Sequence, residues 1–400
     1  MRKILFSLLA VLGTAVFMMP CTVQAEIEVT KAASEFKGNP KLRFVPNDRN
    51  SEATKATYSM LKAADWFDIV PESAPADYIF NMNNSGNRVT YTITNTISGK
   101  KYSVAFPVNS RLDDNVKRGI DLLLKSIFGI DGICHSKLAY TVMTGSGKGN
   151  IFMCDINGGN VQQVTRMSTL CVEPEFTPDG KSLLYTRYGQ SGTGIYQTKL
   201  NPVMTRRIAS YKGLNSGAAV HPGGQYLALV LSRDNRVELY THSLGDSGKK
   251  RITNDPAVEA SPAWSPDGNW ICFVSDRTGR PRLYITGANG GSVEKLDTFG
   301  IEAVSPAWSK DNEIAYIARK DGVYSVVVYN LKTRVNRIVS DGRSNYESVT
   351  WAPDNRHLVC ARLSGGRGEL VIFDTWSGGA RVLRRDGKSI SSPTWSNLLK

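Results

Sequence analysis

The chain has 400 residues, of which 41% are apolar and 21% are charged, and a formal net charge of +13. This apolar content supports packed cores and excludes a largely disordered chain. The basic residues are scattered through predicted turns and strand ends without a recognition helix, and this pattern argues against a nucleic-acid-binding protein.

The N-terminus has the pattern of a secretory signal peptide. Arg2 and Lys3 precede an apolar run over residues 4–19, and Val23-Gln24-Ala25 then offers small residues at the positions that a signal peptidase reads. We therefore expect residues 1–25 to be removed and the mature protein to be exported from the cytoplasm. The alternative, a retained membrane-spanning helix, requires a longer apolar run.

Residues 26–40 show no periodicity and are expected to form an N-terminal arm. The sizeable apolar side chains of the arm are Ile27, Val29 and Phe36. Such a segment cannot bury enough surface to fold alone, but it can become ordered by adding a strand to an exposed sheet edge. The alternative is an inert spacer.

Residues 41–132 are predicted to form a small α/β domain. Apolar residues recur at helical spacing over 53–64 and again over 116–127, where Gly129 is expected to end the second helix. Short segments with the alternation typical of strands precede the first helix and lie between the two.

The rest of the chain, residues 133–400, is dominated by one repeated motif, as in SPAWSPDG at 261–268 and SPAWSKDN at 305–312. Each copy is followed by apolar segments and Gly- or Asp-containing turns that indicate four strands per repeat, which is typical of a propeller blade. The copies recur every 43 or 44 residues and align on a central bulky residue, in turn Phe176, Val220, Trp264, Trp308, Trp351 and Trp395.

The ends of the repeat region predict how the ring closes. Three predicted strands within residues 138–165 have no anchor residue before them, and Trp395 has no strands after it. If the strand of Trp395 joins residues 138–165 in one blade, no sheet edge stays open at the junction. We therefore predict a mainly β fold, with a six-bladed β-propeller of four-stranded blades closed by the C-terminal strand and preceded by the α/β domain.

The sequence resembles the TolB family, the periplasmic component of the Tol–Pal system. SPAWSPDG with the following WICFVSDRTGRPRLYITGANGGSVEKL is similar to the propeller repeat of that family. Leu42-Arg43-Phe44-Val45-Pro46 resembles part of its N-terminal domain, and Ser136-Lys137-Leu138-Ala139-Tyr140 resembles its domain junction. The second repeat departs from the pattern at Val220-His221-Pro222-Gly223-Gly224, which affects expectations about partner contacts more than those about the fold.

The resemblance implies a monomeric binding scaffold that links a Pal-like outer-membrane lipoprotein to a TolA-like inner-membrane protein, reaches the membranes only through these partners, and maintains envelope integrity during cell division. The residues just before each anchor are expected to line one mouth of the channel, and the resemblance favours Pal-like binding there. The arm residues Ile27, Val29 and Phe36 would contact the TolA-like protein. The predicted mouth residues are Glu173, Asn215, Ser216, Glu259, Glu302, Tyr346, Glu347 and Ser391.

Catalytic chemistry is the main alternative, in the form of a propeller enzyme that acts on a peptide or sugar polymer. A propeller peptidase needs a G-x-S-x-G elbow, which the sequence lacks. Its histidines fall at different blade positions, so we expect no metal site, no cofactor and no enzymatic activity. An envelope binding module with other partners is a third reading, and a disulfide between Cys134 and Cys171 stays open.

Overall fold

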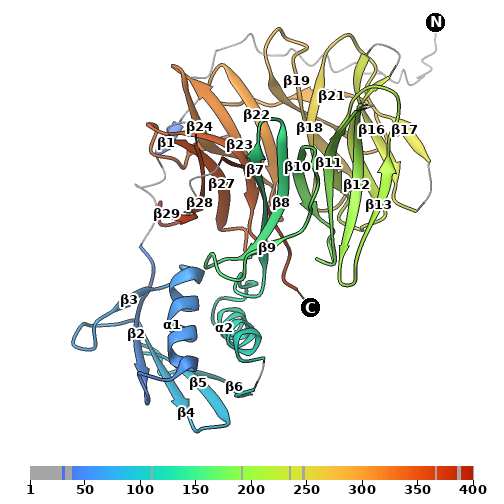
Figure 1. The fold of residues 1–400 in the computed structure, drawn as a ribbon. Coiled ribbons are helices and arrows are strands. Elements are labelled where there is room, and N and C mark those ends of the chain that lie inside the picture. The colour runs from blue at the N-terminus through green and yellow to red at the C-terminus, as the bar shows by residue number, and fades with distance from the viewer. Residues whose placement is uncertain are drawn as a thin grey trace, which may run out of the picture.

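The computed structural model describes residues 29–31 and 38–399, apart from 110, 191, 234–235, 246–247, 365–366 and 385–388. The segment 1–25, and Ile27 and Phe36 of the arm, lie outside the described residues. The chain forms a six-bladed β-propeller with a small α/β domain on one side of the ring, which confirms the predicted fold (Figure 1). No helix within the described residues is long and apolar enough to cross a membrane.

The α/β domain is a five-stranded sheet covered by two helices. Its strand order is β3-β2-β4-β5-β6, in which β2 runs parallel to β3 and β4 while the other pairs are antiparallel. The elements are β2 (Lys41–Pro46), α1 (Glu52–Ala64), β3 (Asp68–Val70), β4 (Tyr78–Asn84), β5 (Arg88–Asn95), β6 (Lys101–Pro107) and α2 (Leu112–Phe128).

The local sequence favours the start of both helices and the end of α2, but not the end of α1. The Ser51 side chain caps α1 by accepting a hydrogen bond from the Thr54 backbone N–H. Helix α2 carries Asp113 and Asp114 in its first turn, where the helix dipole favours negative charge, and ends at Gly129 with φ 76°. Helix α1 ends at Asp65, which has the left-handed conformation with φ 54°, where glycine or asparagine is usual.

The helices lie on the side of the α/β sheet that faces the propeller (Figure 1). Their apolar residues share one continuous core with blades 1 and 6, which includes Trp66, Leu123, Tyr140 and Ile372. A buried ion pair also crosses the interface: the Lys117 ammonium of α2 lies 2.6 Å from the Asp155 carboxylate of blade 1. The α/β domain is therefore packed against the ring through both apolar and charged contacts.

The propeller consists of six antiparallel sheets, numbered here by blade. Blade 1 contains β30 (Ile390–Trp395), β7 (Lys137–Gly145), β8 (Lys148–Asp155) and β9 (Gln162–Gln163). Blade 2 contains β10 (Cys171–Phe176), β11 (Ser182–Gly189), β12 (Gly192–Leu200) and β13 (Val203–Ala209). Blade 3 contains β14 (Asn215–Val220), β15 (Tyr226–Arg233), β16 (Arg236–Ser243) and β17 (Lys249–Arg251).

The last three blades follow the same plan. Blade 4 contains β18 (Glu259–Trp264), β19 (Trp270–Ser275), β20 (Arg282–Gly287) and β21 (Val293–Lys295). Blade 5 contains β22 (Glu302–Trp308), β23 (Glu313–Lys320), β24 (Val323–Asn330) and β25 (Asn336–Ile338). Blade 6 contains β26 (Asn345–Trp351), β27 (His357–Ser364), β28 (Arg367–Asp374) and β29 (Ala380–Arg384).

The repeated tryptophans join neighbouring blades. The indole N–H of Trp264 donates to the carbonyl of Ala219 in blade 3 at 3.1 Å, and that of Trp351 donates to the carbonyl of Ala307 in blade 5 at 3.0 Å. A buried indole needs such an acceptor, and these acceptors lie on the preceding inner strand. The indoles of Trp264 and Trp351 therefore both fill the space between blades and bond across it, whereas the indole of Trp308 donates to Asn312 in its own blade.

The ring closes as the sequence predicts. Strand β30 at the C-terminus pairs with β7, with Ile390 opposite Val142 and Trp395 opposite Leu138. The Trp395 indole also donates to the Ser136 hydroxyl at 2.7 Å. The last strand of the chain thus completes the first blade.

The described part of the arm forms β1 (Val29–Lys31), which pairs in parallel with β25 at the outer edge of blade 5. The arm therefore adds a strand to the sheet edge of the chain's own propeller. The five cysteines of the described residues are buried and free, so no disulfide joins Cys134 and Cys171 in this structure.

A candidate protein-binding channel

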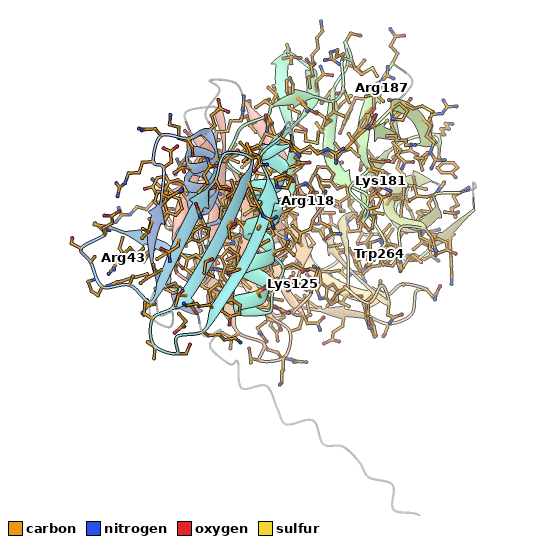
Figure 2. All side chains as sticks on the ribbon, turned by 90° about the horizontal axis from the view of Figure 1, so that it is seen from below. Arg43, Arg118, Lys125, Lys181, Arg187 and Trp264 are labelled. Atoms are coloured by element: carbon orange, nitrogen blue, oxygen red, sulfur yellow. The ribbon has the colours of Figure 1, made fainter. Side chains whose placement is uncertain are left out.

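The inner strands of all six blades surround a central channel with a hollow of about 450 Å³. Its lining includes the six anchor residues and the turns that follow them. Seen from the α/β side, that domain covers one side of the ring, whereas Lys181 of blade 2 and Trp264 of blade 4 lie beyond it (Figure 2). The hollow therefore has walls from every blade, and the α/β domain is offset to one side.

Each inner strand contains a β-bulge at the same place, three residues before its anchor. The pairing register shifts there in every blade, for example between Ala260 and Ala263 and between Val304 and Ala307. The bulged residue has a positive φ in each case: Glu173 56°, Gly217 63°, Ser261 48°, Ser305 53°, Ser348 49° and Ser392 48°.

A positive φ is uncommon for residues other than glycine, and five of these six positions carry a side chain. Left-handed backbone costs such a residue about 1 kcal/mol or more, so its repetition around the channel indicates that the bulges serve a purpose. All six bulged residues line the hollow, and four of them are serines with short polar side chains. This wall can bind a peptide segment through its backbone and small polar groups.

The charged residues of the channel lining are Glu173, Glu175 and Lys310 among the described residues. The Glu173 carboxylate accepts hydrogen bonds from Thr186 in its own blade at 2.9 Å and from the Gly217 backbone at 3.1 Å. Glu175 accepts one hydrogen bond, from Thr394 at 3.1 Å, and burial raises the pKa of its carboxyl to about 7. An unpaired carboxyl of this kind favours a cationic group of a ligand.

Glu175 was missed by the sequence reasoning, although a signal exists. It lies directly before the Phe176 anchor, where the other five repeats have Ala or Thr. Glu175 is the one carboxyl-bearing residue at this aligned position, and this difference indicates a candidate binding residue.

The predicted mouth residues do not gather in the hollow. Of that set only Glu173 lines it, within the part of the chain that the structure describes. Asn215 is fully buried, and its amide donates to the Tyr211 and Thr193 carbonyls at 2.7 and 3.0 Å, which closes the loop before β14. Asn215 thus has a structural role.

Two other predicted mouth residues are also buried. Glu259 accepts from the Arg277 guanidinium at 2.8 Å, and burial raises the pKa of its carboxyl to about 7. Tyr346 packs edge-on against Phe373, with 5.3 Å between ring centroids. These two side chains are not available to a partner in this structure, whereas Glu302, Glu347, Ser216 and Ser391 are half-buried.

A second polar cluster lies where blade 6 meets the end of α1. Potential ligand atoms of Asp65, His357 and Asp374 lie within 4.8 Å of one another. The Arg356 guanidinium, however, donates to both Asp374 oxygens, at 2.8 and 2.5 Å. Because Arg356 occupies that carboxylate, the cluster is an ion-pair network and not a ligand set for a metal ion.

Comparison with known proteins identifies the family of this chain. A family model described as the TolB beta propeller domain matches residues 124–399. The chain belongs to the TolB family. The curated relatives are named after the Tol–Pal system, so the family assignment supports a role in that system.

Curated TolB relatives match over part of their length. The Tol-Pal system protein TolB of Desulfotalea psychrophila is 32% identical over 147 residues, which is 36% of this chain and 33% of the relative. The TolB protein of Desulfosudis oleivorans is 33% identical over 144 residues, 36% of this chain and 32% of the relative. The chain thus aligns with about a third of the length of these relatives.

The fold comparison extends further along the chain. The crystal structure of TolB from Acinetobacter baumannii is similar with a TM-score of 0.82, covering 92% of this chain and 99% of that chain at 24% identity. At this identity the match shows the shared fold of both the TolB propeller and the α/β domain.

Proposed function

We propose that this TolB-family protein is a periplasmic, non-enzymatic scaffold of the Tol–Pal system. In this proposal the propeller, from residue 133 onward, binds a Pal-like outer-membrane lipoprotein, and the arm at 26–40 binds a TolA-like inner-membrane protein. The scaffold would thereby link the two membranes during cell division. The observation that carries the proposal is the channel, whose six bulges include five left-handed residues other than glycine and whose lining includes the Glu175 carboxyl with its raised pKa.

The form of the channel supports a protein partner. Its walls offer backbone groups at the bulges, serine hydroxyls and the edges of the anchor rings, which suit an inserted peptide segment. The raised pKa of Glu175 adds a preference for a cationic side chain of the partner, because a positive charge beside it lowers the cost of ionising the buried carboxyl. We therefore expect a basic residue of the Pal-like protein to lie at Glu175.

The arm supports a second, separate surface. Its backbone over Val29–Lys31 already adopts a strand at the edge of blade 5, so this segment is able to add to a sheet. A TolA-like domain with an exposed edge can accept the same strand. Binding there requires the arm to leave β25 or to pair through its other edge.

Isothermal titration calorimetry tests both surfaces with the mature chain. Glu175→Lys is expected to weaken the Pal-like protein at least tenfold and to leave the TolA-like protein unaffected, while Glu294→Lys on the exposed outer strand β21 serves as the matched charge-reversal control. Deletion of 26–36 is expected to abolish TolA-like binding, and to alter Pal-like binding only through a coupling of about 1–3 kcal/mol. Equal affinities for the Pal-like protein in the Glu175→Lys and Glu294→Lys variants would contradict the channel proposal, and unchanged TolA-like affinity would make the arm a spacer.

A further inference from the structure

A hollow of about 640 Å³ lies between blades 3 and 4 and forms an interblade groove. Its blade 3 wall includes His221, Tyr226 and Lys250, and its blade 4 wall includes Trp264 and Asn289. Apart from Trp264, the lining residues differ from those of the central channel. The groove is therefore a separate site, with a volume in the range of small-molecule sites in proteins.

The blade 3 wall contains the departure from the repeat that begins at His221. In blade 4 the corresponding Ser265 hydroxyl bonds to the Asp267 carboxylate and closes the turn. In blade 3 the turn carries Gly223 in place of the aspartate, and the Gly223 N–H donates to His221 Nδ1 at 2.9 Å. The ring proton of a neutral His221 therefore lies on Nε2, which has no hydrogen-bond partner within the described residues. The change in the repeat thus removes a carboxylate and leaves a donor beside the groove.

The His221 ring is held in place by blade 4. It lies edge-on to the Trp264 ring, with 4.7 Å between ring centroids. It also occupies the space that a side chain at Gly268 would fill, since a Cβ there would collide with the ring. The imidazole therefore forms a fixed part of the groove wall and joins the two blades.

Two lysines of β17 supply positive charge to the groove. The Lys249 ammonium lies over the Tyr211 ring at 4.1 Å, and the Tyr211 hydroxyl lies 3.0 Å from Nε2 of the buried His242. The Lys250 ammonium donates across the groove to the Asn289 amide oxygen at 3.4 Å. Neither lysine forms an ion pair with a carboxylate in the part of the chain that the structure describes. The groove therefore has cations whose charge is not balanced by its own walls.

Blade 5 shows how the same position is balanced elsewhere in the ring. Strand pairing relates Arg337 of β25 to Lys250 of β17. It also relates Glu313 of β23 to Tyr226 of β15. The Arg337 guanidinium lies 3.8 Å from the Glu313 carboxylate. Blade 3 thus keeps the cation but has a tyrosine, which is 49% exposed, in place of the carboxylate.

The other polar groups of the lining are uncharged. The carboxylate next to them in the sequence, Asp267, accepts hydrogen bonds from Ser265 and Asn269 within its own turn. The Asn269 and Asn289 amides and the Thr241 hydroxyl line the groove and are suited to bind hydroxyl groups. A ligand with a carboxylate and several hydroxyl groups would match both the lysines and these neutral groups.

We propose that the interblade groove binds a small hydroxylated carboxylate, the chemical class that includes sugar acids. Lys249 and Lys250 hold the carboxylate, and Lys250 thereby gains the anionic partner that Glu313 gives to Arg337 in blade 5. The exposed Tyr226 ring packs against the carbon skeleton of the ligand. This site is separate from the central channel and does not depend on the partners proposed above.

Titration of the mature chain with glucuronate, glucose and acetate, followed by saturation-transfer NMR and calorimetry, tests this inference. Glucuronate is expected to saturate one site. Glucose lacks the carboxylate and acetate lacks the hydroxyl groups, so each should bind at least tenfold more weakly. Equal affinities for glucuronate and either of the other two probes would overturn the inference.

Two variants of exposed residues locate the site. Lys250→Gln removes a cation, and Tyr226→Glu introduces a carboxylate that would pair with Lys250, so each should weaken glucuronate binding at least tenfold. The matched control is Lys295→Gln, an exposed change on β21 outside the groove lining, which should leave binding unchanged. Wild-type affinity in both groove variants would overturn the inference. Binding of a tetra-aspartate peptide in place of glucuronate would also overturn it, because the ligand would then be an acidic peptide.

Discussion

Glu175→Gln tests the electrostatics of the channel in the absence of any partner. The folded chain raises the pKa of this carboxyl from 4.5 to about 7, because the crowded inner strands remove most of its water. A carboxyl with a raised pKa binds its proton more tightly in the folded state. Its ionisation therefore destabilises the fold progressively as pH rises from about 4.5 through about 7.

The magnitude follows from the size of that change. One pKa unit corresponds to about 1.4 kcal/mol, so the rise of the Glu175 pKa from 4.5 to about 7 gives at most about 3.5 kcal/mol of destabilisation above pH 7. Partial contact with channel water reduces this figure, and we expect about 1–3 kcal/mol. Glutamine is neutral at every pH and keeps an acceptor for the Thr394 hydroxyl. Glu175→Gln should therefore stabilise the chain at pH 8 and have almost no effect at pH 4.5.

Urea denaturation at both pH values measures the difference. The control is Glu72→Gln, because Glu72 is an exposed carboxylate of the α/β domain that pairs with Arg49. The reasoning fails if Glu175→Gln destabilises the chain equally at both pH values, since this result would mean that the ionised carboxylate has a stabilising partner in the channel.

Three further predictions concern ring closure, blade packing and chemistry. Deletion of residues 389–400 removes β30 and exposes the edge of β7, so the protein should aggregate or lose its cooperative transition in calorimetry; an unchanged melting midpoint would contradict this closure. Gly368→Ala should destabilise the fold by about 1–3 kcal/mol in urea denaturation, because the added methyl group collides with the Ile390 carbonyl, while Gly38→Ala, with open space around it, should be nearly neutral. The purified protein should show no turnover of peptide or polyuronate substrates with or without divalent metal; metal-dependent activity that is lost in His357→Gln would refute a purely binding role.

The features that the sequence predicts correctly are those with a local or periodic cause. The anchor spacing follows from one indole or apolar side chain filling the same space between successive blades. The ring closure through Trp395 follows from an unpaired strand at each end of the repeat region. The end of α2 follows from Gly129, whose φ of 76° costs other residues more.

The predicted mouth residues illustrate what periodicity leaves undetermined. Alternation along a strand assigns side chains to faces only while the register holds. The mouth residues are predicted from their position before each anchor, but the bulges at Ser261 and its five counterparts insert an extra residue between the anchor and most of these positions. Glu259 and Asn215 therefore point into buried networks, and the channel lining begins at the bulged residue.

The ion-pair network of Asp65, His357 and Asp374 could not be found from the sequence for a different reason. Asp65 and His357 are 292 residues apart in the sequence, and no repeat relates the α/β domain to blade 6. Their proximity depends on how the two domains pack, which involves the shared apolar core. The parallel pairing of Val29–Lys31 with β25 is non-local in the same way.

Site-specific photocrosslinking in the native envelope tests the central claim most directly. A photoreactive residue at Thr350, which lines the channel, is compared with one at Val203, which is 73% exposed on the outer strand of blade 2. The account predicts that Thr350 crosslinks to a Pal-like lipoprotein, identified by mass, and that Val203 does not. Absence of a lipoprotein at Thr350, or the same products from both positions, would contradict partner binding in the channel.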